Sequence, residues 1–198
     1  MDSTRCKFAA MVVVLGAASG MAHAQQRFQL TEYSAKFLCG VVEDRGPGSP
    51  VQPGTYSTSI NIHNAEIVTP VTFVKKVVLA PVEPVAQKEP VPPSRFRRDQ
   101  LKPDFAEYVD CKVIRGMLGP AGTAPFVEGF VMVIALPANK ELTPSQLDVV
   151  GVYSVSSREG QDTDLEMLPA TQHVLTFPPA AGAKMRDEML KDAAKDTE

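Results

Sequence analysis

The chain of 198 residues contains no tryptophan, and it has only four tyrosines, three cysteines and three histidines. The scarcity of tryptophan and tyrosine argues against a carbohydrate cleft. No Gly-x-Ser-x-Gly nucleophile elbow occurs. The glycine-rich stretch 116–122 lacks the Gly-Lys-Ser/Thr ending of a phosphate-binding loop. These absences leave the sequence without a recognisable catalytic or nucleotide-binding motif.

The first 24 residues have the pattern of a secretory signal peptide. Arg5 and Lys7 precede an apolar run over residues 8–21, and residues 22–24 supply an Ala-His-Ala cleavage site. We therefore expect cleavage after Ala24 and export to the periplasm or the extracellular space. No later segment is long and apolar enough to cross a bilayer, which predicts a protein without a transmembrane anchor.

Cleavage of this leader would remove Cys6 and leave Cys39 and Cys111. Two cysteines in an exported chain predict one disulfide, and two buried free thiols are the alternative. His63 and His173 have no zinc-ligand spacing from either cysteine. We therefore expect no metal site and no cofactor.

The net charge of the whole chain is −3, and its charges are scattered. Such a chain is a poor binder of nucleic acid, so the expected partner is a protein or a small molecule. All 17 prolines lie after the leader. Frequent proline argues against long helices and favours short strands joined by structured loops.

Alternating and apolar segments predict about seven short strands. The clearest is Thr55–His63, where Tyr56, Thr58, Ile60 and Ile62 share one face. The expected strand segments are Tyr33–Val42, Thr55–His63, Val71–Ala80, one around Val109 to Ile114, Phe126–Leu136, Leu147–Val155, Asp164–Leu168 and Gln172–Phe177. They predict an all-β fold, a single antiparallel β-sandwich over residues 25–177. Residues 25–32 are expected to be a flexible lead-in, and 178–198 a charged tail that is partly helical or disordered.

Residues 81–103 are rich in proline and predict a long exposed loop between strands. This segment carries Arg95, Phe96, Arg97 and Arg98, which form a candidate interaction site for a phosphate or an acidic partner. The alternative is a solvated loop, because three basic residues alone give only weak, salt-sensitive binding.

Asn61, His63 and Asn64 cluster at the end of the alternating strand. They are a candidate site for a small polar ligand. The alternative is a strand end whose asparagine side chains bind loop backbone, and one imidazole with two amides is a weak set of metal ligands.

Two acidic groups are also candidates. Asp162, Asp164 and Glu166 have alternate spacing, but the glycine and distant glutamate of a calcium loop are missing. A charged strand edge that resists edge-to-edge pairing explains them better. The second group is expected to be ordinary surface charge and consists of Asp104, Glu107 and Asp110.

Several segments together resemble a family of uncharacterised exported bacterial proteins. They are Tyr33 to Gly40 (YSAKFLCG), Gly54 to Asn64 (GTYSTSINIHN), Phe73 to Val77 (FVKKV), Val109 to Cys111 (VDC), Gly129 to Val133 (GFVMV) and Leu147 to Tyr153 (LDVVGVY). The resemblance implies one β-sandwich domain and pairs Cys39 with Cys111. The chain is more distantly similar to the sensory rhodopsin transducer fold. No functional residue follows from either resemblance.

We therefore expect an exported, non-enzymatic β-sandwich protein that acts through binding or interaction. The alternative is a hydrolase whose site is built from loops and shows no sequence motif. A deep pocket with His63 or His173 in hydrogen-bond reach of a carboxylate or a serine would favour the enzyme.

Overall fold

The computed structural model describes residues 27–43, 51–80, 91–138, 141–144, 146–156 and 163–195. The predicted leader therefore lies outside the described residues. The elements are β1 (Phe28–Val42), β2 (Gly54–His63), β3 (Val71–Leu79), β4 (Arg97–Leu101), β5 (Ala106–Asp110), α1 (Cys111–Leu118), the 3₁₀ helix η1 (Gly119–Thr123), β6 (Phe126–Leu136), β7 (Asp148–Ser156), β8 (Thr163–Pro169), β9 (Thr171–Phe177) and α2 (Pro179–Ala194).

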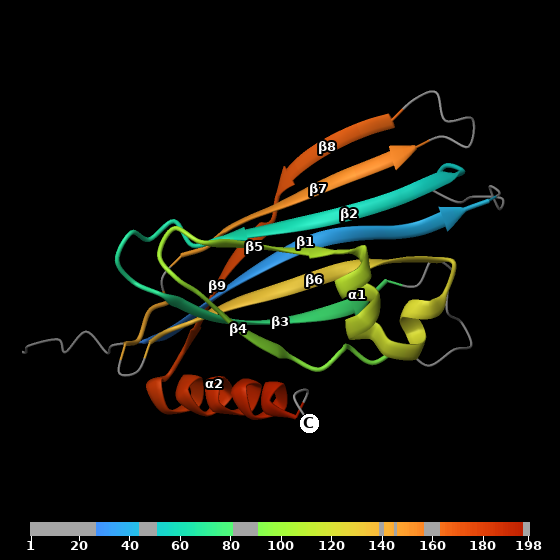
Figure 1. Cartoon of the computed structure of the whole chain (residues 1–198). Helices are drawn as coiled ribbons and strands as arrows, with labels where there is room; N and C mark the ends of the chain where they lie inside the picture. The colour runs from blue at the N-terminus through green and yellow to red at the C-terminus, as the bar shows by residue number, and fades with distance from the viewer. Residues whose placement is uncertain are drawn as a thin grey trace, which may run out of the picture.

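The nine described strands form one antiparallel sheet (Figure 1). Its order is β4-β3-β6-β1-β2-β7-β8, with β5 paired to β2 and β9 paired to β1. The all-β antiparallel prediction is confirmed. The sheet is a single open one rather than a closed sandwich of two sheets, because β1 hydrogen-bonds directly to β2 over Gly40–Val42.

Strand β1 is the centre of the sheet, since it pairs with β6, β9 and β2. The expectation of a flexible lead-in is wrong for residues 28–32, because Phe28–Ser34 pairs with β9 at the other end of the chain. Gly40 has φ +118°, and a Cβ there would lie 1.9 Å from the Pro125 carbonyl oxygen. Glycine is therefore required where β1 turns from β6 toward β2.

The main core lies on one face of this sheet. The predicted alternation of β2 is confirmed, because Thr58, Ile60 and Ile62 are buried while Ser57 and Asn61 are exposed. The largest fully buried side chains of this core are Phe37, Phe73, Ile60, Ile62, Ile114, Val71, Val77, Val109 and Val131.

Side-chain hydroxyls bridge β1 and the strands that diverge from it. The Thr58 hydroxyl donates to the Leu38 carbonyl at 2.9 Å and accepts from the Leu38 N–H at 3.0 Å. The Tyr153 hydroxyl donates to the Lys36 carbonyl at 2.8 Å. Burial, and then the nearby charge of Glu166, raise the pKa of Tyr153 above its ordinary value of 10.0.

Residues 111–118 form helix α1, so the expected strand ends at Asp110. The Asp110 carboxylate accepts from the Val113 N–H at 2.8 Å and caps the helix. Ile114, Met117 and Leu118 are buried on the face toward the core. The 3.6-residue period thus decides this segment over its β-branched composition.

Cys39 and Cys111 form a disulfide that joins β1 to the first residue of α1, with a Cα–Cα distance of 5.6 Å. Arg115 lies beside this link and donates to four backbone carbonyls. They belong to Cys39, Gly122, Ala124 and Pro125. Its guanidinium therefore fixes α1 against β1 and the segment that leads into β6.

The prediction of an exposed loop over residues 81–103 is wrong in its second half. Arg97–Leu101 is strand β4, which pairs with Val71–Lys75 of β3. The residues of the segment that lie outside the described ranges are 81–90. Strand β4 forms because the edge of β3 offers unpaired backbone groups, a long-range effect that its polar sequence does not reveal.

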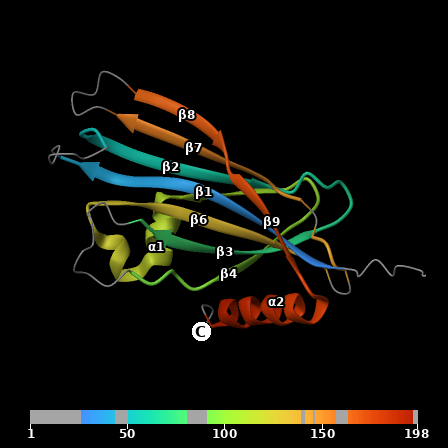
Figure 2. The same ribbon diagram turned by 180° about the vertical axis from the view of Figure 1, so that it is seen from behind.

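The C-terminal tail is helical from Pro179 to Ala194 and packs on the second face of the sheet (Figure 2). Met189 joins Phe28, Leu30 and Val74 in a smaller core. A Cβ on Gly182 would lie 2.2 Å from the Phe28 ring, so the helix backbone contacts β1 closely. Among the described helices, none has the length and apolar character needed to cross a membrane.

Candidate functional site

The structure places the four residues of the predicted interaction site at β4 and next to α2. The Phe96 N–H donates to the Asp192 carboxylate at 3.0 Å, and the Lys76 ammonium lies 4.9 Å from the Phe96 ring centre. Arg95 donates to the Lys195 carbonyl at 3.4 Å. Phe96 therefore helps to attach α2, and it is not a free contact residue.

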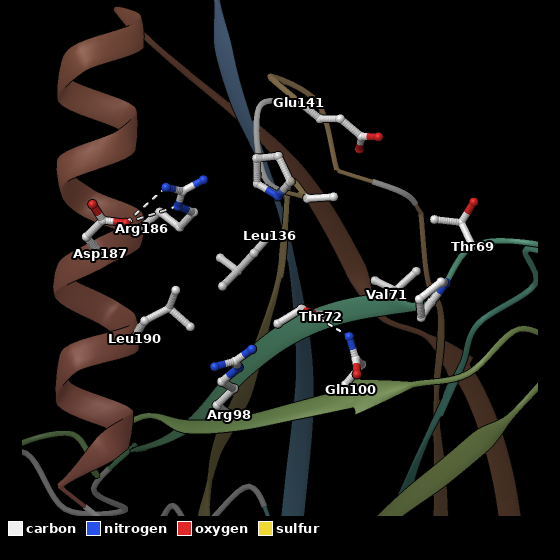
Figure 3. A pocket seen from close by; sticks show the side chains of 13 residues that line it. Thr69, Val71, Thr72, Arg98, Gln100, Leu136, Glu141, Arg186, Asp187 and Leu190 are labelled. Atoms are coloured by element: carbon white, nitrogen blue, oxygen red, sulfur yellow. Dashed lines mark hydrogen bonds and ion pairs between the residues drawn. The ribbon is translucent and has the colours of Figure 1, made fainter.

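Arg98 borders a cavity of about 500 Å³ between α2, β4, β3 and the end of β6 (Figure 3). Its polar lining includes Gln100, Arg186 and Glu141. The apolar lining consists of Pro70, Val71, Leu136, Pro137, Ala138 and Leu190. The cavity thus combines an apolar wall with charged and polar side chains, and α2 contributes Arg186, Asp187 and Leu190 to it.

A second cavity of about 640 Å³ continues on the other side of Arg98. Its lining shares Arg98 and Leu190 with the first, and it adds Arg97, Val113 and the end of α2 at Ala194. We call the two adjoining cavities the α2 cleft. Arg98 lines both cavities of the cleft, so a ligand in either cavity can reach its guanidinium.

The charged groups of the cleft differ in how they are paired. Arg186 binds the Asp187 carboxylate at 3.1 Å, and its side chain is only 22% exposed. Arg98 is exposed, and no described residue forms a hydrogen bond or ion pair with its side chain. Gln100 donates to the Thr72 hydroxyl at 3.2 Å. Arg98 is therefore the cation of the cleft that is available to an anion.

Lys75 also lines the cleft, but its charge is already neutralised. Its ammonium lies 2.8 Å from Asp99 and 2.6 Å from Glu107, and its side chain is 8% exposed. It thereby joins β4 to β5 across the gap where these strands do not pair. Lys75 interrupts the apolar pattern of β3, and this interruption is the sequence signal that points to the cluster. Glu107, by contrast, was expected to be ordinary surface charge.

The structure separates the three residues of the other predicted ligand site. Asn64 is fully buried, and its amide donates to the carbonyls of Thr69, Leu101 and Lys102. Its side-chain oxygen accepts from the Glu66 N–H at 3.1 Å. Asn64 therefore has the backbone-binding role that was the alternative to a ligand site.

Asn61 and His63 lie on the opposite, outward face of β2. His63 Nε2 lies 3.3 Å from Asp104, and Nδ1 lies 3.5 Å from Asp148. His63 thus has the carboxylate contact that the enzyme hypothesis required. The enzyme hypothesis also required a deep pocket at His63 or His173. Neither histidine lines a cavity of the α2 cleft, so this cleft is not that pocket.

The acidic group near the C-terminus lies on the edge strand β8. Asp164 and Glu166 are exposed there, while Asp162 lies outside the described residues. Across the described part of the chain, no three His, Cys, Asp or Glu side chains gather as metal ligands would.

Arg186, Gln100 and Thr72 were missed by the sequence analysis. A signal existed for Arg186, because Gly182, Met189 and Ala193 are spaced as one helical face, and Arg186 falls on it. Nothing in the sequence indicates which strands this face contacts.

No family model, no curated protein and no solved structure matches this chain. The resemblance to exported bacterial proteins thus stays a prediction, and the functional argument depends on the geometry of the cleft.

Proposed function

We propose that this protein is an exported, non-enzymatic binding protein that holds a ligand with a carboxylate or phosphate group in the α2 cleft. The observation that carries the proposal is the position of Arg98. It is an exposed guanidinium at the junction of two cavities, and no described side chain neutralises it.

The chemistry of arginine supports an oxyanion as the ligand group. A guanidinium presents a planar set of N–H donors that matches the two oxygens of a carboxylate or phosphate. Gln100 adds a neutral donor on the same side of β4. Leu136 and Leu190 form apolar walls, so the rest of the ligand is expected to be apolar.

Export is supported by the leader pattern and by the disulfide. A structural disulfide persists in oxidising compartments and is rare in the cytosol. The Cys39–Cys111 bond is compatible with the periplasm or the extracellular space. The binding partner is therefore expected among the solutes or proteins of that compartment.

The proposal is tested by titrating the protein with hexanoate and with inorganic phosphate while the arginine Nε–Hε signals are followed by NMR. We expect a saturable shift of the Arg98 signal with at least one of the two probes. In Arg98→Gln the affinity should fall about tenfold or more, because a charge-assisted hydrogen bond contributes roughly 1.5–3 kcal/mol.

Arg95→Gln is the matched control. It removes the same charge from an exposed position three residues away, where the guanidinium lies outside both cavities. Equal weakening by the two variants would indicate a general charge effect. That result, or the absence of a saturable shift for both probes, would contradict the proposed site.

A hydrolase is the second candidate, and the contacts of His63 with Asp104 and Asp148 favour it. A histidine oriented by a carboxylate is the usual general base of such enzymes. Hydrolysis of p-nitrophenyl acetate that is lost in His63→Asn and kept in Arg98→Gln would replace the binding proposal with this one.

A further inference from the structure

Strand β8 is the last strand of the sheet. It pairs with β7 from Val150↔Pro169 to Ser156↔Thr163, and no other described strand pairs with it. Figure 1 shows it as the outer strand at the end of the sheet opposite β4. One edge of its backbone therefore presents N–H and C=O groups to solvent.

The side chains of β8 alternate in chemistry. Leu165 and Met167 lie on one face and are 66% and 68% exposed. Asp164 and Glu166 lie on the other face, where they are paired in register with Val155 and Tyr153. No described cation forms an ion pair with either carboxylate. The edge thus has one apolar row, and on its other face an acidic row of two carboxylates that is followed by Leu168, which is 46% exposed.

The neighbouring strand continues the apolar row beside Met167 and is polar beside Leu165. Val152 is paired in register with Met167, and Ser154 with Leu165. An added strand would place its own apolar side chains beside Leu165 and Met167. Its residues on the opposite face would lie beside two carboxylates.

A second copy of this chain would bring like charges together in two of the three closest registers. Antiparallel pairing of two β8 strands about a two-fold axis puts residues of the same face opposite one another. In full overlap, Glu166 lies opposite Glu166 of the other copy. A shift by one repeat puts Asp164 opposite Glu166 in one direction and Leu168 opposite Glu166 in the other. Like charges directly opposite each other destabilise a strand pair.

We propose that the β8 edge binds an extended segment of another protein that carries lysine or arginine at alternate positions and apolar residues between them. Backbone hydrogen bonds to β8 supply affinity in this mode, and the alternating side chains supply specificity. Asp164 and Glu166 select the basic residues of the segment. Leu165 and Met167 select the apolar ones. This site is independent of the α2 cleft.

The probe is a seven-residue peptide that alternates lysine and valine and carries a fluorescent label. Fluorescence anisotropy with the full chain is expected to show saturable binding. The double variant Asp164→Asn, Glu166→Gln should weaken binding about tenfold or more, since two opposite-charge contacts are lost. A peptide that alternates glutamate and valine should not bind.

Glu188→Gln is the matched control variant, because Glu188 is an exposed glutamate on α2, away from β8. It should leave the affinity within about twofold. Circular dichroism of the double variant of β8 checks that the fold is kept. The peptide variants are tested on the wild-type protein, so their results do not depend on the folding of that variant.

Two N-methylated peptides separate strand addition from charge attraction. In one peptide the backbone nitrogens of the lysines are methylated, and in the other those of the valines. Only one set donates to β8 in an added strand, so one peptide should lose about tenfold in affinity and the other should bind nearly as before. Equal affinities of the two methylated peptides would overturn the proposal. Absence of binding by the unmodified peptide would also overturn it, and the acidic row would then serve only to protect the edge from pairing.

Discussion

Individual polar side chains hold this protein together where its backbone ladder opens. Thr58 and Tyr153 bind the Leu38 and Lys36 carbonyls of β1, ahead of the point where β1 begins to pair with β2, and Arg115 binds four carbonyls around the disulfide. Asn64 does the same for the loop after β2. Thr58, Asn64 and Arg115 thereby satisfy part-buried backbone groups that would otherwise cost free energy to leave unpaired.

Tyr153→Phe should change the response of the fold to high pH. The fold favours the neutral phenol, so its pKa is raised above 10.0. The stability contributed by this group is full below pH 10 and is lost as pH rises through the raised pKa. The variant should lose about 1 kcal/mol of unfolding free energy at neutral pH through the missing hydrogen bond, and then lose less than wild type as pH rises.

Urea unfolding at neutral pH and at about pH 10.5 measures this difference. Tyr108→Phe is the control, because Tyr108 is 65% exposed. A steeper alkaline loss in Tyr153→Phe than in wild type would disprove the assigned role.

At the scale of elements, the two helices attach to the sheet in different ways. Helix α1 is held by its cap, the disulfide and Arg115, whereas α2 is held by close packing on Phe28 and by Phe96. Because the α2 cleft lies between α2 and β4, its shape depends on the packing of that helix.

The two helix glycines distinguish these modes of attachment. Gly182→Ala places a Cβ against the Phe28 ring and should destabilise the protein by about 1–3 kcal/mol. Gly116→Ala in α1 meets nothing within 4 Å and should stabilise it by roughly 0.5–1 kcal/mol through helix propensity. Thermal unfolding measures both, and stabilisation by Gly182→Ala would show that α2 does not pack on β1 as described.

The elements also differ in how far the sequence predicts them. Strands β2 and β6 were predictable, because alternation or a continuous apolar run is a local property. Strand β4 was not, since its residues are mostly polar and only Leu101 is buried. For the site, the basic cluster indicated Arg98, but the cavity depends on the docking of α2, which is a long-range contact.

At the scale of the whole molecule, the Cys39–Cys111 bond closes a loop across a sequence separation of 72 residues. The loop contains β2, β3, β4 and β5. It therefore spans four of the nine described strands, and it restricts the unfolded chain more than a short link would.

Replacement of both cysteines by alanine should lower the unfolding free energy by up to about 4.4 kcal/mol on the chain-entropy model. Chemical unfolding of the variant beside wild type measures the loss. Thiol titration of unreduced, denatured chain beginning at Gln25 should find no free thiol, and two free thiols would contradict the bond. A variant as stable as wild type would contradict its contribution.

The pairing of β1 with β9 has a consequence for how the protein is made. A chain leaves the ribosome or a membrane channel with its N-terminus first, so β1 emerges long before Phe177, the residue that pairs with Phe28. Strand β6, its other main neighbour, also comes late in the chain. The central strand thus lacks its β6 and β9 partners while most of the protein is delivered, and only β2 is available early. Folding can therefore be completed only after the whole chain has left the ribosome or the channel. Until then β1 is exposed and needs the protection of a chaperone.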